Sequence, residues 1–280
     1  MSVKIGLALG GGGARGFAHL GVAMALRQLN VPVHCVAGTS IGAIIGGVIA
    51  AGVEDEAMKW VDVPDWKKLP QLFFEVCIPW RGLLRGRKIE KFLRRTIPAS
   101  DFSDLKMPLA VVATDYNSGG EVVIASGDVH TAIRASMSIP GVFNPVALNG
   151  RVLVDGGLVN PVPVDVCRSL GADVVIAVDI NANKSLMAHR SISDVNIFDA
   201  LDMMFTLCTN RLTQTNLAKH PPDLLLSPPL RDIMMLDFRH AKELVAQGYE
   251  YAMLRRGDIR RIAQEQPAES RSPLHPQVDM

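Results

Sequence analysis

The chain has 280 residues, with 29 basic and 28 acidic side chains, and 48% of its residues are hydrophobic. A single domain of this length buries about three quarters of the surface of its unfolded chain, so a large core is expected. The balanced charge excludes the strongly basic surface that nucleic-acid binding usually requires, and no nucleic-acid partner is expected. The first four residues (MSVK) lack the basic and apolar regions of a signal peptide, so we expect a cytoplasmic location.

The cysteines agree with a reducing compartment. They form no CxxC pair and no Cys/His spacing suited to zinc, so no metal site is expected. All four lie among apolar residues, and we expect them to be buried free thiols: Cys35, Cys77, Cys167 and Cys208.

The amino-terminal residues predict a strand, a glycine loop and a helix. Residues 4–9 (KIGLAL) predict a buried strand, residues 10–13 interrupt it, and helical spacing of apolar residues runs from Arg15 to Leu29. The candidate core positions of this helix are Phe17, Leu20, Ala23, Met24 and Leu26.

The loop between these two elements, GGGARG at 11–16, matches the GxGxxG pattern of dinucleotide-binding folds. A nicotinamide site would place an acidic residue after the second strand, about 20 residues further on, to bind the ribose hydroxyls. The first acidic residue after the loop is Glu54, and no GK[ST] follows as a phosphate-binding loop requires. A nucleotide cofactor is therefore not indicated. The loop amides could instead stabilise an oxyanion, and close helix packing is the structural alternative.

A second strand, predicted at 33–37, leads into GTSIG at 38–42, which is a G-x-S-x-G sequence around Ser40. Small residues two positions before and after a serine allow a sharp strand-to-helix turn that exposes the hydroxyl. This is the pattern of a nucleophile elbow, although a serine that caps a helix explains the pattern alone equally simply. The predicted helix at 41–51 is apolar on every face and must be buried.

The proposed elbow lies within a segment, 31–53, whose 23 residues carry no formal charge. Its length would suffice to cross a bilayer. Pro32, five glycines and the turn at 38–40 instead favour a strand, a turn and a buried helix.

The next segment, from Trp60 to Thr96, combines aromatic and basic side chains. Such a mixture suits the surface of an anionic membrane, and we hypothesise that this segment covers Ser40 and makes peripheral contact with lipid. The alternative is a solvated basic helix from about Arg87 whose apolar residues face the core. The residues concerned are Trp60, Trp66, Phe73, Phe74, Trp80 and Phe92, with Arg81, Arg85, Arg87, Lys88, Lys91, Arg94 and Arg95; Ile89, Phe92 and Leu93 would face the core.

Two further β-branched runs, LAVVATD at 109–115 and DVVIAVDI at 173–180, are typical of parallel strands covered on both faces. Between them, residues 146–154 predict a hairpin around Asn149-Gly150, the turn pair that best fits hairpin twist. The hairpin leads directly into DGG at 155–157. We therefore expect an α/β fold with a mostly parallel sheet and one antiparallel hairpin.

A serine nucleophile requires a base, and Asp155 emerges from the hairpin strand with Gly156 and Gly157 behind it. An aspartate in such a loop can also simply cap the turn. None of the seven histidines follows a strand in a comparable glycine-flanked loop. A Ser-Asp-His order could nevertheless recruit one of the later ones, namely His189, His220 or His240.

The motifs GGGxRG at 11–16, GTSIG at 38–42 and DGG at 155–157, in this order, resemble the patatin-like phospholipase family, and most of all its small bacterial members of the RssA type. The resemblance covers residues 4–180. The segment ASMSIPG at 135–141 also resembles the loop that precedes the aspartate hairpin of the family. The resemblance implies a three-layer α/β/α fold and a serine-aspartate dyad, with Ser40 as the nucleophile and Asp155 as the proton acceptor.

The same resemblance assigns the oxyanion hole to the glycine loop and implies hydrolysis of phospholipid, lysophospholipid or other acyl esters without a metal or organic cofactor. The alternatives are a Ser-His-Asp hydrolase or acyl transferase, and a weakly active regulatory protein that binds lipid. Arg15 either holds the shape of the loop, which we favour, or faces an anionic head group. The oxyanion residues are Gly11, Gly12 and Gly13, and the supporting residues are Arg15, Gly16, Gly38, Gly42, Gly156 and Gly157.

The domain organisation is expected to be simple. Residues 1–263 should form one patatin-like domain, with the motifs in a core at 4–180 and a helical carboxyl-terminal part at 181–263. Amphipathic patterns at 195–217 and 238–262 should pack on the sheet or on a second subunit, so self-association stays open. The tail at 264–280 is rich in polar residues and proline and should be disordered.

Overall fold

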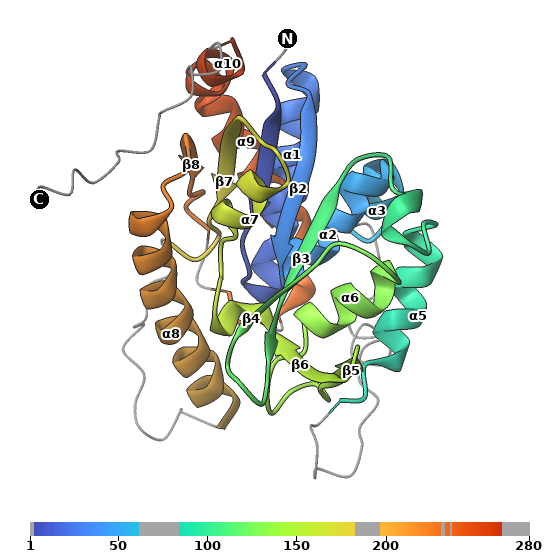
Figure 1. Cartoon of the computed structure of the whole chain (residues 1–280). Helices are drawn as coiled ribbons and strands as arrows, with labels where there is room; N and C mark the ends of the chain where they lie inside the picture. Colours follow the sequence, from blue (N-terminus) through green and yellow to red (C-terminus); the bar gives the residue numbers. More distant parts are fainter. Residues whose placement is uncertain (1–2, 62–83, 183–196, 231–232, 236, 265–280) are drawn as a thin grey trace, which may run out of the picture.

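The computed structural model describes residues 3–61, 84–182, 197–230, 233–235 and 237–264. These residues form one eight-stranded sheet with helices on both faces (Figure 1). The strands are β1 (Ile5–Leu9), β2 (Val33–Thr39), β3 (Leu109–Asp115), β4 (Glu121–Ile124), β5 (Val146–Leu148), β6 (Arg151–Asp155), β7 (Val174–Val178) and β8 (Leu224–Leu226). The helices are α1 (Phe17–Gln28), α2 (Ile41–Ala51), α3 (Glu54–Met58), α5 (Arg87–Thr96), α6 (Val129–Ser136), α7 (Val164–Ser169), α8 (Ile197–Lys219), α9 (Ala241–Leu254) and α10 (Arg256–Gln264), with 3-10 turns η1 (Gly13–Gly16), η2 (Phe102–Asp104), η3 (Gly156–Leu158) and η5 (Phe238–His240).

The order of the strands is β5-β6-β3-β2-β1-β7-β8, and β4 pairs with the other side of β3. β1 pairs in parallel with β2 and β7, β2 pairs in parallel with β3, and β7 with β8. The pairs of β3 with β4 and β6, and of β5 with β6, are antiparallel. The expected mostly parallel sheet with an attached hairpin is confirmed. The short strands β4 and β8 were not predicted.

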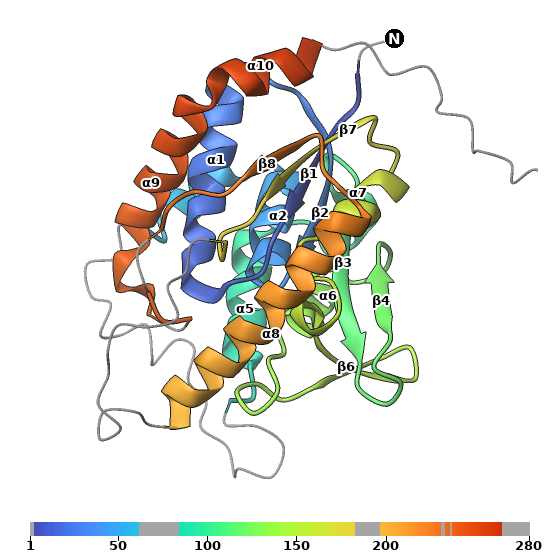
Figure 2. The same ribbon diagram turned by 90° about the vertical axis from the view of Figure 1, so that its left-hand side faces the viewer.

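The sheet separates two cores, because successive side chains of a strand point to opposite faces. On one face β1 places Ile5, Leu7 and Leu9 in a large core that also contains residues of α1, α2, α6 and α9. On the other face Ala8 of β1 joins a smaller core of alanine, valine and cysteine side chains with α7. Figure 2 shows α7 and α8 on the side of the sheet opposite α1 and α9. The three-layer α/β/α arrangement follows.

The uncharged segment at 31–53 forms β2, a turn and α2, as predicted. Ten of the eleven residues of α2 are buried, with only Ile41 partly exposed. Burial on every face explains the lack of charge in this segment. Among the described residues, no helix is both long enough and apolar enough to cross a membrane.

The other helices differ from the predicted ranges at their ends. η1 occupies 13–16, so α1 begins at Phe17 rather than at Arg15. The predicted helix at 238–262 is divided into η5, α9 and α10. α9 packs on α1 rather than directly on the sheet, because Gly21 and Gly248 let the two backbones approach: a Cβ at Gly21 would meet the carbonyl oxygen of Val245.

The expectation that all four cysteines are buried was wrong for Cys208. Cys35 on β2 and Cys167 on α7 are buried free thiols, whereas Cys208 is exposed on α8. The reason is that α8 covers the sheet with one side only, and apolar residues such as Met204 and Leu207 face outward beside Cys208. Cys77, residues 62–83 of the predicted cover and the tail from 265 lie outside the described residues.

Candidate active site

β3 brings the two candidate catalytic residues together. β2 pairs with β3 as far as Thr39, which lies opposite Val112, and β6 pairs with β3 from Asp155, which lies opposite Ala113. β4 occupies the other side of β3 at these positions, so β2 and β6 lie on the same side and run toward each other. Ser40 follows the last residue of β2 and therefore meets Asp155 at the end of β6.

Ser40 adopts the backbone conformation of a nucleophile elbow. Its φ of 55° and ψ of −120° are rare for a residue with a side chain and are retained only where the surroundings impose them. Gly38 and Gly42 allow the sharp turn, since a Cβ at Gly38 would meet the backbone of Gly42 and one at Gly42 would meet the carbonyl of Leu9. The small residues of the GTSIG sequence are therefore required by close backbone contact.

Hydrogen bonds on both sides hold this turn in place. The amide of Ser40 donates to Oγ of Ser136 at 2.8 Å, and Ser136 Oγ donates to the carbonyl of Val112 at 2.5 Å. One residue earlier, Thr39 Oγ1 donates to the carbonyl of Asn160 at 2.7 Å. The turn is thus tied to β3 and to the segment that follows Asp155.

The serine and the aspartate are joined by a short hydrogen bond. Ser40 Oγ donates to Asp155 Oδ2 at 2.6 Å, and the amide of Gly157 donates to Asp155 Oδ1 at 2.8 Å. The Asp155 side chain is fully buried. Burial raises the pKa of its carboxyl to about 7, although the hydrogen bonds from Ser40 and Gly157 oppose the rise. A carboxyl with a pKa near neutrality suits general-base chemistry at physiological pH.

The two glycines after Asp155 leave no room for side chains. A Cβ at Gly156 would meet the carbonyl of Val112, and a Cβ at Gly157 would lie 3.0 Å from Oδ1 of Asp155 and 3.2 Å from the ring of Phe205 on α8. The DGG sequence therefore lets the chain turn tightly around the carboxylate.

The glycine loop lies beside Ser40, because a Cβ at Gly11 would be 3.4 Å from the Cβ of Ser40. The amide of Gly11 donates to the carbonyl of Pro161 at 3.0 Å, and the amide of Ala14 donates to the carbonyl of Met235 at 2.8 Å. Within the described part of the chain, the amides of Gly12 and Gly13 have no hydrogen-bond acceptor. Of the three expected oxyanion donors, Gly11 thus already uses its amide in a hydrogen bond to Pro161.

Arg15 and Gly16 hold the loop against its neighbours. Arg15 is only 2% exposed, and its Nε donates to the carbonyl of Gly12 at 3.2 Å. A Cβ at Gly16 would meet the side chain of Ile41, so the loop packs directly on α2. The buried guanidinium agrees with a role in holding the loop rather than in meeting a head group.

None of the described histidines forms a hydrogen bond with Ser40 or Asp155. His220 follows the end of α8, and His240 lies beside the carboxylates of Asp237 and Glu243. His189 lies outside the described residues. His19 is fully buried under the glycine loop, where Nε2 donates to the carbonyl of Gly10 at 2.8 Å and burial lowers its pKa to about 4.

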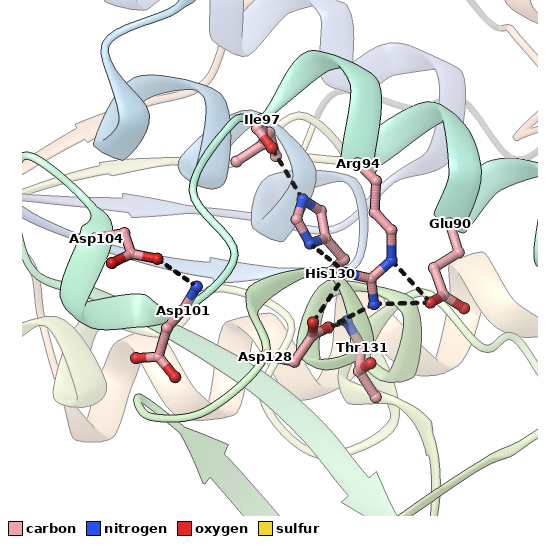
Figure 3. A network of polar contacts seen from close by, with 8 residues as sticks. All are labelled: Glu90, Arg94, Ile97, Asp101, Asp104, Asp128, His130 and Thr131. Carbon is pink, nitrogen blue, oxygen red and sulfur yellow. Dashed lines mark hydrogen bonds and ion pairs between the residues drawn. The ribbon is translucent and has the colours of Figure 1, made fainter.

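His130 belongs to a structural network between α5 and α6 (Figure 3). Arg94 can only donate, so its contact with Nδ1 of His130 at 3.2 Å makes that nitrogen an acceptor, and Nε2 donates to the carbonyl of Ile97 at 2.9 Å. Arg94 also pairs with Asp128 and Glu90. Both ring nitrogens are thus occupied by partners other than Ser40 and Asp155.

Two polar residues at the site were not predicted. Ser136 supports the amide of Ser40, and Asn181 donates from Nδ2 to the carbonyl of Gly11 at 2.8 Å. Ser136 lies in the ASMSIPG segment, and Asn181 follows the carboxyl end of β7, the edge where α/β proteins gather functional groups. No group of three or more His, Cys, Asp or Glu side chains in the described ranges is arranged to hold a metal ion.

The fold and site define a three-layer α/β protein with a buried serine at a strand-to-helix turn, hydrogen-bonded to an aspartate. The family model of patatin-like phospholipases matches residues 7–168, which is more than half of the chain. The chain belongs to the patatin-like phospholipase family, as its motifs indicated.

Several curated proteins are similar over this region. An uncharacterized NTE family protein of Mycobacterium tuberculosis is 39% identical over 184 residues, which are 66% of this chain and 51% of that protein. Patatin-like phospholipase domain-containing protein ZK370.4 of Caenorhabditis elegans is 33% identical over 288 residues, covering 88% of this chain and 20% of its own length. The chain thus spans about half the length of the mycobacterial relative and about a fifth of the length of the Caenorhabditis elegans protein.

Among solved structures, VipD from Legionella pneumophila has a TM-score of 0.61 at 13% sequence identity. The match covers 92% of this chain and 67% of VipD. At this identity the similarity concerns the fold alone.

Proposed function

We propose that this protein is a serine acyl-ester hydrolase that acts on phospholipid or lysophospholipid esters. The observation that carries the proposal is the 2.6 Å hydrogen bond from Ser40 Oγ to the buried carboxylate of Asp155. Membership of the patatin-like phospholipase family supports a lipid ester as the substrate.

In the proposed reaction Asp155 accepts the proton of Ser40 while Oγ attacks the carbonyl carbon of the ester. The tetrahedral intermediate collapses to an acyl-serine, and the alcohol leaves with the proton held by Asp155. Asp155 then removes a proton from water, which attacks the acyl-serine. Release of the fatty acid returns that proton to Ser40.

The negative oxygen of the tetrahedral intermediate requires hydrogen-bond donors that are already in place. We assign this role to the amides of Gly12 and Gly13, which directly follow Gly11 beside Ser40 and are not used by other described residues. The φ of Gly13 is 62°, and a Cβ there would meet the carbonyl of Met235. Glycine is therefore needed for this conformation of the loop.

An alkyl fluorophosphonate tests the proposal, because it forms a bond between phosphorus and an activated serine oxygen and releases fluoride. We expect stoichiometric modification of Ser40 in the folded protein, identified by mass spectrometry of peptides, and hydrolysis of a panel of phospholipids and lysophospholipids. The buried Ser138 serves as the internal control and should stay unmodified. Folded protein that leaves Ser40 unmodified would contradict the proposal.

We also propose that α5 contacts anionic lipid while the substrate is bound. Ile89 and Leu93 face the core, as the helical alternative predicted, while Phe92 packs on Trp60 with ring centroids 5.0 Å apart. The opposite face carries exposed basic residues, among them Arg87, Lys91 and Arg95. A chain of hydrogen bonds connects the start of α5 with the site. Arg134 donates to the carbonyl of Arg85, two residues before α5, and to Oγ of Ser138. The carbonyl of Ser138 in turn accepts from the amide of Asp155.

Replacement of Arg87, Lys91 and Arg95 by glutamine should weaken binding to phosphatidylserine-containing vesicles about 100-fold. Each basic residue near an anionic surface contributes about 1 kcal/mol. The matched control replaces Arg256, Arg260 and Arg261 of α10, which makes the same change in net charge at the amino-terminal edge of the sheet (Figure 1). Vesicle sedimentation that gives equal losses for both variants, or salt-independent binding, would contradict the role of α5.

A further inference from the structure

Asn181 holds one peptide unit of the glycine loop. Its Nδ2 donates to the carbonyl of Gly11 at 2.8 Å, and the side chain is buried. On the adjacent residue, a Cβ at Gly12 would lie 2.7 Å from Oδ1 of Asn181. The amide group of Asn181 thus lies directly against the Gly11–Gly12 peptide.

This contact fixes the direction of the Gly12 amide. The described chain contains no cis peptide bond, and in a trans peptide the C=O and N–H groups point in opposite directions. A donor that holds the carbonyl of Gly11 therefore turns the N–H of Gly12 away from Asn181. Hydrogen bonding at the carbonyl also polarises the peptide and strengthens its N–H as a donor.

Asn181 is itself held firmly. It follows β7, whose residue Val178 accepts from the amide of Gly10, and its own amide donates to Oδ1 of Asp179 at 2.9 Å. The amide of Asp179 in turn donates to the carbonyl of Leu226. The carboxyl edge of β7 therefore places Asn181 at a fixed position beside the loop.

We propose that Asn181 is a positioning residue that aims the Gly12 amide at the oxyanion formed on Ser40. This assignment rests on the proposed hydrolase function. Arg15 performs the equivalent task for the next peptide, since its Nε donates to the carbonyl of Gly12 and so orients the amide of Gly13. The two side chains thus bind the carbonyls of the two peptides whose amides have no acceptor among the described residues.

Asn181→Leu removes the donor and keeps a similar volume. We expect kcat for a soluble short-chain ester to fall about 10- to 100-fold with KM changed less than about twofold, because loss of an oxyanion donor acts on the transition state. Asn216→Leu is the matched control, since Asn216 also donates to a backbone carbonyl, that of Val159 at 3.0 Å. Asn216→Leu should lower the melting temperature about as much as Asn181→Leu does, and it should leave kcat within about twofold of the parent value.

Asn181→Asp provides a rescue that a purely structural role would not give. When protonated, the introduced carboxyl can donate to the carbonyl of Gly11, and when ionised it cannot. The buried carboxyl of Asp179 beside it disfavours ionisation, whereas the nearby Arg15 favours it. The ratio of variant to parent kcat should therefore rise as the pH falls.

An Asn181→Leu variant with undiminished kcat, or an Asn181→Asp ratio that does not change with pH, overturns the assignment. These results are distinct from failure of the proposed function, in which the parent chain itself shows no turnover that depends on Ser40. In that case the assignment of Asn181 falls with the function. A parent with Ser40-dependent turnover and an unaffected Asn181→Leu variant disproves the positioning role alone.

Discussion

Ser40→Ala is expected to lower kcat for a soluble chromogenic ester by about 10⁴-fold, because it removes the hydroxyl that is hydrogen-bonded to Asp155. The fold should persist, since alanine occupies the same turn and Gly157 still donates to the carboxyl. Loss of the Ser40 hydrogen bond should raise the pKa of Asp155 further, because that bond favours the ionised form. Turnover and thermal unfolding are measured on the same preparations.

Ser118→Ala is the control for this substitution. Ser118 lies exposed in the turn after β3, and its replacement should leave kcat within about twofold. A Ser40→Ala protein that is folded and keeps more than about a tenth of the parent turnover would show that the reaction does not use this serine.

Asp155→Asn should lower kcat by about 10³-fold or more, because an amide has nearly the same shape as the carboxyl but cannot accept the proton of Ser40. In the parent chain, activity should be low at acidic pH and rise through about pH 7 as Asp155 ionises, since burial raises its pKa to about 7. The residual activity of the Asp155→Asn variant should lack this rise around pH 7. The pH dependence of kcat/KM measures both.

Replacement of His220 or His240 by glutamine distinguishes this dyad from a serine-histidine mechanism. Both variants should keep the parent rate and the same pH midpoint, because neither histidine is bonded to Ser40. Undiminished activity in Asp155→Asn, or loss of activity in one of the histidine variants only, would favour the histidine mechanism.

The same carboxyl links activity to stability. Its pKa is raised from 3.8 to about 7 in the folded protein, so the proton is held more tightly in the folded state than in the unfolded state. The resulting stabilisation is fully present below about pH 4 and is lost as the pH rises through about 7. The free energy of unfolding of Asp155→Asn, relative to that of the parent, should therefore increase when the pH is raised from about 5 to about 8.5. Urea unfolding of both proteins at the two pH values measures this change.

The sequence predicted those elements whose residues repeat a clear pattern. β3 has the predicted range, 109–115, and the hairpin turns at Asn149 and Gly150, both with positive φ. β4 and β8 were missed because they have four and three residues, too few to show an alternation, and depend on pairing with β3 and β7. Tertiary hydrogen bonds, not local preference, make these strands.

In the site, too, the sequence predicts the residues of local motifs and misses the partners that depend on tertiary contacts. Ser40 and Asp155 stand in local motifs, and in the structure Ser40 Oγ lies 2.6 Å from Asp155 Oδ2. The partners of the glycine loop lie far along the chain: the carbonyl of Pro161 uses the Gly11 amide, and Asn181 binds the Gly11 carbonyl. No local pattern identifies such partners, so the sequence could not tell which amides stay free.

The strand that brings Ser40 and Asp155 together contains neither of these residues. Val112 and Ala113, two neighbouring residues of β3, lie opposite Thr39 and Asp155, so pairing with β3 sets how far apart β2 and β6 end. A shift of β6 by one residue would place Val154 opposite Ala113 and turn the carboxylate to the other face of the sheet. The separation of the reacting oxygens is therefore independent of the length of chain between Ser40 and Asp155. Insertions in that long connection should be tolerated wherever they leave the pairing of β3 and the hydrogen bond from the Ser40 amide to Ser136 intact.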